Sequence, residues 1–419
     1  MAVQPTQRRA KRKHRTIILP ITEEHYAEII ADPQRFRDEW IDPFYADCPE
    51  LFPVGFEQGY EMKGHYKSKR QNIIIRRIAL RDGTKYQFRP SFVLPMMVAR
   101  TDEVEAALFL RKFGVPYWAL ARVFGHNATF WYRLEISIGR NSIVGTTVKT
   151  VPMPIDLLAD EHHEKINGEK VYIATTVANG CIFGAEVSLS ATTDDLKKAY
   201  GVFKEEVLAI EPEYAPSTVN TDGYAGTIGA WRVLFPTVTL ILCFLHAWLR
   251  IRDRSKTLAN FFELGEKVWN VYYSTTKRMM VQRIRCLRDW ATNNVAGVAL
   301  EKTLALCDKQ AEWSLWYENE NAYTTSNELD RLMRSQNRYF DRGQHFHGSW
   351  ESANLRSRAW AILHNYWQWS PESVAANGGA NCPAERLNGK RYCECWLENL
   401  FVATSLAGTK KPPPKIRND

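Results

Sequence analysis

The chain has 419 residues and a formal net charge of +8, and its eight cysteines are scattered without paired spacing. It has neither an uninterrupted run of 18 apolar residues nor an apolar N-terminal stretch, which argues against a membrane-spanning helix and a signal peptide. We therefore expect a cytoplasmic protein of two to four domains, with reduced thiols and no membrane contact.

The positive charge is concentrated at the two ends of the chain. Residues 1–16 contain six basic residues and no acid, and residues 409–419 contain four basic residues and one acid. Both ends have too few apolar residues to form a core, so we expect disordered segments at 1–16 and 408–419. The arm at 1–16 suits binding to a nucleic acid, and it is equally compatible with a solvated tail.

Residues 17–100 are expected to form a helical region followed by a β-hairpin. Helical periodicity is clear around Thr22–Trp40, where a proline interrupts it. Further along, Asn72–Leu80 and Thr84–Arg89 are rich in β-forming residues and are separated by an Asp-Gly pair, which is a strong turn signal. The pattern predicts two antiparallel strands.

The predicted hairpin is strongly basic. Residues 63–89 contain nine basic residues and one acid, and a basic two-stranded ribbon can lie on DNA phosphates or enter a groove. A purely structural hairpin is the alternative. The segment contains no cysteine, so we predict no zinc site here. The residues expected to contact DNA are Lys69, Arg70, Arg76 and Arg77.

Residues 101–150 are predicted to form three helices and a linker, with the helices at Asp102–Phe113, Pro116–Phe124 and Ala128–Ile138. A short helix, a glycine-containing turn and a second helix are typical of a helix-turn-helix, in which the later helix enters the major groove of DNA. We therefore expect Thr129 and Arg133 on the third helix to contact DNA. The alternative is a plain three-helix bundle whose aromatic residues all lie in the core.

Residues 151–254 contain two short apolar runs that each end on an aspartate. The first, Pro154–Asp160, begins a predicted three-stranded meander that continues with Val171–Ala178 and Cys181–Leu189. The second run ends on Asp222. Ligands of α/β proteins bind at the carboxyl ends of parallel strands, so Asp160 and Asp222 are candidate site residues.

The chain alternates strand and helix around Asp222, as a mixed sheet with covering helices requires. A helix is predicted at Thr192–Ile210 and a strand at Thr237–Leu242, after which Cys243 and His246 open a basic helix in a C-x-x-H pattern. Asp156 competes with Asp160, because alternation puts both on one face of the strand. Asp160 is favoured because it lies at the predicted strand end.

Residues 255–320 contain no convincing strand and are predicted to form an all-helical insertion. Residues 321–407 are expected to complete the core and to end in C-terminal helices. Within them, Thr324–Arg338 has serine and asparagine cap candidates before a helical pattern, with Glu328 in the first turn. Glu328 is the candidate third acid. The competing glutamates are Glu318, Glu320 and Glu351.

These landmarks, in this order, resemble the DDE transposases of bacterial insertion sequences and of Mutator-like elements. The likeness covers about residues 100–405, and it is carried by Asp160, the TDGYAGT sequence around Asp222, the C-x-x-H pair and the T-x-S-N-E glutamate. It implies an α/β fold with a ribonuclease H-like mixed-sheet core. It also implies that Asp160, Asp222 and Glu328 bind two Mg²⁺ ions, for which Mn²⁺ can substitute, while His246 and Cys243 support the site.

The resemblance implies a DNA transposase that hydrolyses phosphodiester bonds and transfers strands at the ends of a mobile element. Its expected partners are double-stranded DNA, as terminal inverted repeats and as target, and further copies of itself on that DNA near the nucleoid. Two alternatives stay open, a non-catalytic DNA-binding protein derived from a transposase and a ribonuclease H-like nuclease or resolvase. Zinc is not predicted, because clean C-x2-C spacing is missing among the remaining candidates. These are Cys382, Cys393, Cys395, His345 and His347.

Overall fold

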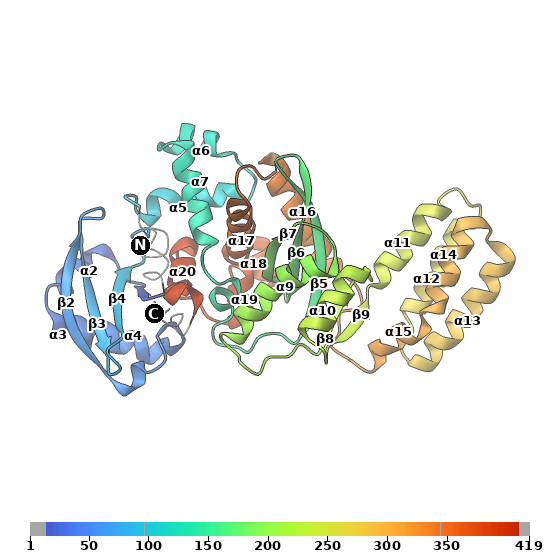
Figure 1. Ribbon diagram of the computed structural model, residues 1–419, viewed down its shortest axis with the longest axis horizontal. Helices are drawn as coiled ribbons and strands as arrows, with labels where there is room; N and C mark the ends of the chain where they lie inside the picture. Colours follow the sequence, from blue (N-terminus) through green and yellow to red (C-terminus); the bar gives the residue numbers. More distant parts are fainter. Residues whose placement is uncertain (1–13, 96, 344, 410–419) are drawn as a thin grey trace.

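The structure is a computed structural model that describes residues 14–95, 97–343 and 345–409. It has a mixed α/β fold with two mixed β-sheets. Three parts follow one another along the longest axis: an N-terminal sheet, a central sheet with covering helices, and an all-helical part that projects beyond the central sheet (Figure 1). Among the described residues, no helix combines the length and apolarity needed to cross a bilayer.

The N-terminal sheet has four strands in the order β1-β4-β3-β2. Strands β3 (Ile73–Leu80) and β4 (Lys85–Pro90) are antiparallel, which confirms the predicted hairpin. Strand β2 (Tyr60–Ser68) pairs with β3 and was missed, because its mostly polar residues stay exposed and give no apolar alternation. The last strand, β1 (Thr16–Leu19), pairs in parallel with β4.

Strand β1 changes the boundary of the predicted N-terminal arm. Thr16 is already part of the strand, so the predicted disorder at that residue is wrong. Residues 1–13 of the arm lie outside the described residues. At the other end, Gly408 is buried in a short turn at Ser405–Gly408 rather than belonging to a disordered tail, and 410–419 also lie outside the described residues.

One face of the N-terminal sheet is covered by short helices, α2 (Glu23–Ile29), α3 (Pro33–Phe36) and α4 (Asp42–Asp47). The buried Phe36 of α3 packs edge-on against Phe88 of β4. A π-helical turn at Arg37–Ile41 and 3-10 turns at Pro49–Leu51 and Phe56–Gln58 complete this layer.

Arg76 contradicts its predicted role as a DNA contact. Its side chain lies on the covered face of β3, only 3% exposed, and its Nε donates a 2.6 Å hydrogen bond to the Ile30 carbonyl. A second guanidinium nitrogen donates to the Ala31 carbonyl. Carbonyls just past a helix end attract basic groups, and Ile30 is the C-cap of α2, so Arg76 fastens that helix to the sheet.

Three helices follow the N-terminal sheet at the predicted positions. They are α5 (Thr101–Arg111), α6 (Tyr117–Phe124) and α7 (Ala128–Ile138). The start of α7 is fixed by Asn127, whose side chain accepts a 2.8 Å hydrogen bond from the Phe130 N–H. The segment predicted as a linker contains a further short helix, α8 (Ile143–Thr147).

The central sheet has five strands in the order β7-β6-β5-β8-β9. Strands β6 (Glu169–Ala178) and β7 (Cys181–Ser188) extend from β5 as the predicted antiparallel meander. On the other side of β5, strands β8 (Thr218–Thr221) and β9 (Thr239–Leu242) run parallel to it.

Strand β5 spans Asp156–Ile166, so Asp160 lies inside the strand and the predicted strand end at Asp160 is wrong. The polar sequence EHHEK looked like a turn, but the segment pairs with β6 up to Ile166, and the turn comes at Asn167 and Gly168. His162 is buried there rather than exposed. The long antiparallel pairing with β6 therefore overrides the polar composition.

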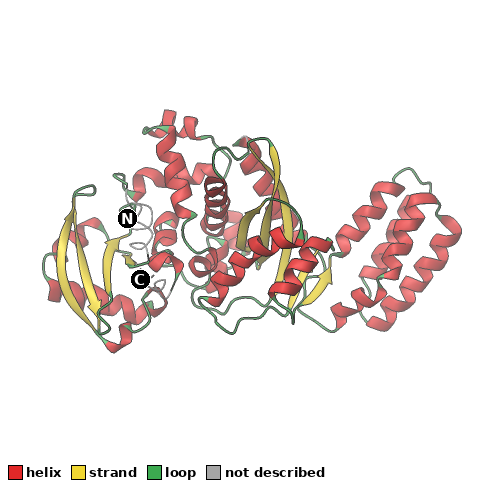
Figure 2. Cartoon of the chain, in the orientation of Figure 1, coloured by secondary structure: helices red, strands yellow, loops and turns green. Residues whose placement is uncertain are grey.

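Helices cover both faces of the central sheet and make a three-layer arrangement (Figure 2). Leu157 and Ala159 face a core shared with α9 (Thr193–Leu208) and α10 (Ala225–Leu234). Leu158, on the opposite face, belongs to the core of α16 (Asn327–Arg342) and α17 (Trp350–Tyr366). Alternation along β5 thus decides which residues face α16.

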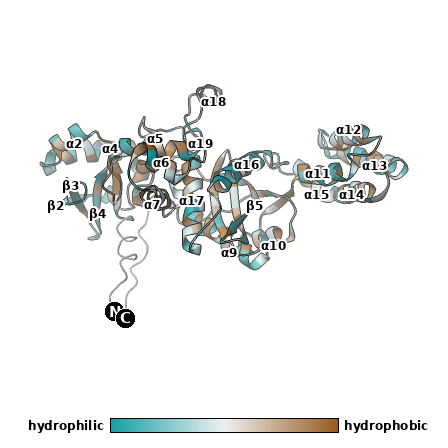
Figure 3. Cartoon of the chain, turned by 90° about the horizontal axis from the view of Figure 1, so that it is seen from above, coloured by the Kyte–Doolittle hydropathy of each residue, from teal (hydrophilic) through white to brown (hydrophobic). Residues whose placement is uncertain are grey.

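The segment predicted as a helical insertion, 255–320, is helical, and it shares a hydrophobic core with α11 (Phe244–Ser255) and with Ile241 and Leu242 of β9. The all-helical part therefore begins earlier than predicted. It contains α11, α12 (Phe261–Tyr272), α13 (Lys277–Asn294), α14 (Gly297–Asp308) and α15 (Gln310–Ser314). A 3-10 turn at Leu315–Tyr317 follows. Figure 3 shows this part at one end of the molecule and the sheet of β2, β3 and β4 toward the other.

The C-terminal helices bring the chain back to its beginning. They are α18 (Pro371–Ala376), α19 (Pro383–Asn388) and α20 (Trp396–Ala403). Beyond α20, the Ser405 hydroxyl accepts a 2.9 Å hydrogen bond from the Ile18 N–H of β1. The N-terminal sheet is therefore fastened to the end of the described chain.

Candidate metal centre beside the central sheet

Asp160 and Asp222 are brought together by the register of two parallel strands. The last residue pair between β5 and β8 is Leu158 with Asn220. Two residues further along each strand are Asp160 and Asp222, so the register places them next to each other where β8 has ended. Asp222 begins the following turn, and its carboxylate accepts a 2.7 Å hydrogen bond from the Tyr224 N–H.

Asp160 also belongs to a group of three close ligand atoms, and Asp222 is not part of this group. Asp160 of β5, His246 of α11 and Asp330 of α16 each offer a ligand atom, and these atoms all lie within 4.8 Å of one another. Within the described part of the chain, no other group of three His, Cys, Asp or Glu side chains is this close. The pairing of Asp160 with His246 agrees with the expectation from the resemblance.

Glu328, the predicted third acid, is not in this group. Its carboxylate accepts a hydrogen bond from the Gly180 N–H in the turn between β6 and β7. Asp330, two residues later in the first turns of α16, lies beside Asp160 instead. Helical periodicity puts Glu328 and Asp330 on opposite flanks of the buried Leu329, so the sequence alone could not tell which flank faces β5.

The Ser326 side chain contacts both Asp330 and His246 of this group. From the sequence, Ser326 was only a candidate helix cap. Its buried hydroxyl lies 3.2 Å from the Asp330 carboxylate, 3.4 Å from Nδ1 of His246 and 3.2 Å from Sγ of Cys243. The Ser326 N–H also donates to the Cys243 sulfur at 3.2 Å. One hydroxyl therefore links the first turn of α11 to the first turn of α16.

Burial and neighbouring acids make Asp160 hard to ionise. Burial, as the largest cause, together with Glu161 and Asp222 raises the pKa of Asp160 to about 7, while the Glu161 N–H and His246 act in the opposite direction. Glu161 points to the opposite face, where it accepts hydrogen bonds from Tyr200 (2.6 Å) and Thr227 (2.8 Å). A bound cation would relieve this repulsion at Asp160.

His246 is held in its protonated form when no cation is present. Its hydrogen bond with Cys243 raises the pKa of His246 to about 9, although burial opposes this, and the charges of Asp160 and Asp330 add to the effect. For Cys243 the burial of the thiol acts upward, but the hydrogen bond with His246 gives a net lowering of the pKa. A cation that used His246 as a ligand would therefore release a proton.

One arginine reaches the edge of this group. A guanidinium nitrogen of Arg250, one turn beyond His246 on α11, lies 3.7 Å from the Asp222 carboxylate and 3.3 Å from its carbonyl oxygen. The Arg250 side chain is 53% exposed, so it pairs only weakly with Asp222 and stays available to an anion from solvent.

The competing acids have other surroundings. Asp156 starts β5 and accepts a 2.6 Å hydrogen bond from the Thr218 hydroxyl. Glu318 pairs with Lys277 at 3.0 Å, and Glu320 and Glu351 are exposed. Among the described residues, the cysteines and histidines named as zinc candidates form no group of three close ligand atoms. They are Cys382, Cys393, Cys395, His345 and His347.

Of the predicted DNA contacts other than Arg76, all are exposed. Thr129 and Arg133 lie on the open face of α7, whose buried residues Trp131 and Leu134 face inward. Lys69 and Arg70 occupy the turn between β2 and β3, and Arg77 lies over the Tyr66 ring at 5.7 Å. These positions are compatible with phosphate contacts, which remain a prediction.

The donor set fits a hard or borderline divalent cation. Carboxylate oxygens are the ligands that Mg²⁺ and Mn²⁺ prefer, and an imidazole nitrogen suits Mn²⁺ better than Mg²⁺.

No protein-family model matches the chain. No curated protein shows significant similarity to it.

Proposed function

We propose that the chain is a DNA strand-transfer enzyme that depends on divalent cations held by Asp160, Asp222 and Asp330. The observation that carries the proposal is the close group of Asp160 on β5, Asp330 at the start of α16 and His246, together with the charge of Asp222 that acts on Asp160 from the end of β8. These acids are far apart in the sequence. Their approach costs electrostatic repulsion, which a purely structural site would have no reason to maintain.

The order of the strands supports a ribonuclease H-like core. The first strand of the central sheet, β5, lies in the middle, with β6 antiparallel to it, and β8 and β9 are parallel neighbours on the other side. The acids sit on the first strand, after the fourth strand and on a late helix, as the resemblance to DDE transposases implies. We assign the third acid to Asp330 in place of Glu328, because Asp330 lies beside Asp160.

We assign different roles to the side chains at this site. A pair of cations, when bound, would stabilise the attacking and leaving oxygens of a phosphodiester. Asp160, Asp222 and Asp330 would hold such cations, and Ser326 would keep Asp330 and His246 in place. Arg250, exposed beside Asp222, would supply positive charge to the phosphate.

Binding to DNA is assigned to the N-terminal surfaces. Arg133 and Thr129 on α7 would enter a groove, while Lys69, Arg70 and Arg77 would contact phosphates of the same duplex. Arg76 is excluded from this set, because it binds backbone carbonyls in the interior.

The proposal is tested with the full chain and duplex DNA that carries the sequences flanking its own gene. We expect strand cleavage at the ends of the element with Mg²⁺ or Mn²⁺ and none with EDTA. The Asp222→Asn variant should bind the same duplex with unchanged affinity and fail to cleave it. Cleavage by Asp222→Asn, or binding without cleavage by the wild type in any metal, would reject the enzyme and favour the non-catalytic alternative. Cleavage without joined products would favour a nuclease.

A further inference from the structure

Arg89 of β4 has a guanidinium group without a partner among the described residues. Its Nε is closed off from solvent and makes no hydrogen bond. The side chain is partly buried, and within the described part of the chain its guanidinium takes part in no ion pair. Of the five N–H donors of this guanidinium, the one on Nε is therefore buried without an acceptor, which is unfavourable.

The Arg89 side chain lines a cavity between three parts of the fold. The cavity is lined by residues of β1, of β4 and the segment after it, of the end of α7 with Asn141, and of α20 with its C-cap Thr404, and none of them is an acid. About 30 Å³ of it is open to the centre of a water molecule, more than the roughly 10–15 Å³ that one water needs. Its lining residues are Thr16, Ile18, Arg89, Pro95, Ser137, Ile138, Asn141, Phe401 and Thr404.

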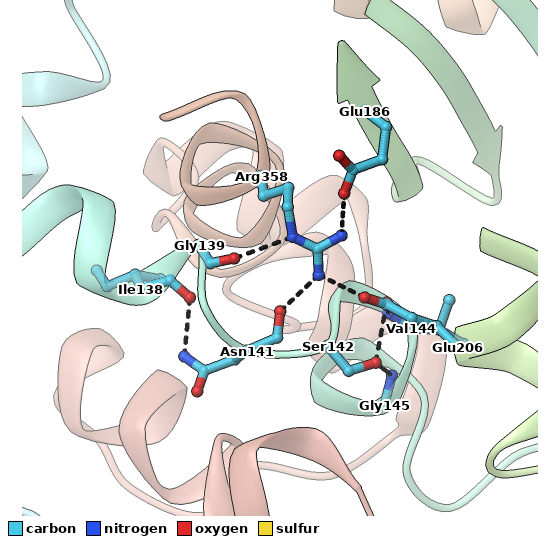
Figure 4. A network of polar contacts seen from close by, with 9 residues as sticks. All are labelled: Ile138, Gly139, Asn141, Ser142, Val144, Gly145, Glu186, Glu206 and Arg358. Carbon is cyan, nitrogen blue, oxygen red and sulfur yellow. Dashed lines mark hydrogen bonds and ion pairs between the residues drawn. The ribbon is translucent and has the colours of Figure 1, made fainter. Parts of the chain in front are cut away.

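A second buried arginine nearby shows what the chain does when it supplies the partners itself. Arg358 of α17 forms ion pairs with Glu186 and Glu206, and it donates hydrogen bonds to the Gly139 carbonyl (2.9 Å) and the Asn141 carbonyl (2.8 Å) (Figure 4). Asn141 also lines the cavity at Arg89. The two arginines thus meet the same segment, one with two carboxylates and the other with none.

Arg89 keeps its charge in this position. Burial lowers the pKa of Arg89 to about 10, which leaves the guanidinium protonated at neutral pH. The buried Nε–H therefore stays a charged donor, and an acceptor that enters the cavity from outside the chain, above all an anion, would satisfy it.

We propose that this cavity binds an oxyanion of the phosphate class, held by the guanidinium fork of Arg89. Two parallel N–H···O bonds from a guanidinium match the oxygen spacing of phosphate and sulfate. Asn141 uses one amide N–H on the Ile138 carbonyl (2.8 Å) and has a second one to offer. The bound anion would join the N-terminal sheet to α20 and the segment after α7, so binding should raise the stability of the folded chain.

The anion has two possible sources, a free phosphate ion and a backbone phosphate of DNA. The DNA source is compatible with the same sheet, because Arg77 pairs with Gln87 of β4, two residues from Arg89, and therefore lies on the same face. None of the lining residues belongs to the Asp160 group, so binding here does not depend on the proposed cleavage activity.

The test measures thermal unfolding of the full chain with increasing inorganic phosphate, at an ionic strength held constant with sodium chloride. We expect the wild-type melting temperature to rise by several degrees. Arg89→Gln should melt higher than the wild type without phosphate and show no response to it. Lys85→Gln, which removes a positive charge from an exposed position on the same strand, should respond as the wild type does.

A wild type that does not respond, or an Arg89→Gln variant that responds equally, would overturn the proposal. If Arg89→Gln does not fold, Arg89→Lys replaces it. This variant keeps the charge without the fork and should bind phosphate at least several-fold more weakly, and an unchanged affinity would overturn the proposal. A short DNA duplex separates the sources: competition with phosphate identifies a backbone phosphate, and independent binding identifies the free ion.

Discussion

Glu135 of α7 and Asp160 of β5 are two interior carboxylates with opposite surroundings. Glu135 is fully buried and accepts hydrogen bonds from Arg111 Nε (2.6 Å), the Tyr117 hydroxyl (2.8 Å) and the Tyr339 hydroxyl. Burial alone would raise the pKa of Glu135, but the charge and hydrogen bond of Arg111 more than offset this and lower it. Glu135 is therefore a structural charge whose partner belongs to the chain.

Among the described residues, Asp160 has no arginine or tyrosine partner, and the cation beside it is His246. The N–H of Glu161 donates a 2.8 Å hydrogen bond to it, while burial and the acids Glu161 and Asp222 raise the pKa of Asp160 to about 7. The difference shows that Glu135 is surrounded by arginine and tyrosine donors, whereas one histidine faces both Asp160 and Asp330. A site left with excess negative charge is suited to a cation from solution.

The largest expected effect separates Asp330 from Glu328. Asp330→Asn should lower the rate of DNA cleavage by about a thousandfold or more, because the lost ligand acts on charge that develops in the transition state. Glu328→Gln should keep most of the activity, since Glu328 binds the Gly180 backbone and not the acid group. Cleavage rates on the same duplex give the comparison. The reverse result would restore Glu328 as the third acid.

Removing the charge of Glu135, which is paired with Arg111, should instead lower the stability of the folded chain. Glu135→Gln leaves Arg111 buried with its countercharge removed, and we expect the free energy of unfolding to fall by about 3–5 kcal/mol. Denaturation by urea measures this fall. The double variant Arg111→Met with Glu135→Leu removes both charges and should lose clearly less, and an equal loss would mean that packing rather than charge dominates.

Removing the charge of Asp160 should instead raise the stability of the folded chain. The pKa of Asp160 in the folded chain, about 7, lies above the usual aspartate value of 3.8. The unfolded chain therefore ionises first as the pH rises, so the free energy of unfolding should fall between about pH 4 and pH 7, by a few kcal/mol at most. In EDTA, Asp160→Asn should remove this fall and be more stable than the wild type at pH 8. A less stable variant at pH 8 would contradict the repulsion.

The smallest expected effect concerns Ser326, which positions the acid group without neutralising it. Ser326→Ala removes the hydroxyl contacts to Asp330 and His246, which should cost about 1 kcal/mol of stability. It should also weaken Mn²⁺ binding several-fold while leaving the binding of DNA unchanged. A calorimetric Mn²⁺ titration measures the effect, and Ser326→Thr, which keeps a hydroxyl, should recover most of the affinity.

Local patterns were enough to predict most elements. The helices α5, α6 and α7, the hairpin of β3 and β4, the meander of β6 and β7 and the helical insertion carry their periodicity and turn residues in the sequence. Asp160, Asp222 and His246 were also singled out, Asp222 and His246 from a strand end and the C-x-x-H pattern, and Asp160 from a strand end that the structure places six residues later.

What the sequence missed depends on contacts between distant segments. The partner β6 extends β5 past Asp160, the end of α2 draws Arg76 into the interior, and the rotation of α16 selects Asp330 over Glu328. The unpaired guanidinium of Arg89 likewise appears only when β4, α20 and the segment after α7 come together. None of these contacts can be predicted from the local sequence pattern.

The most direct test of the cation site is a Mn²⁺ titration of the full chain at pH 7.5, followed by electron paramagnetic resonance. The wild type and Glu328→Gln should bind Mn²⁺ with similar affinity, and Asp160→Asn and Asp330→Asn should each bind it at least tenfold more weakly. Equal Mn²⁺ binding by the wild type and Asp330→Asn would contradict the assignment of Asp330 to a cation site with Asp160.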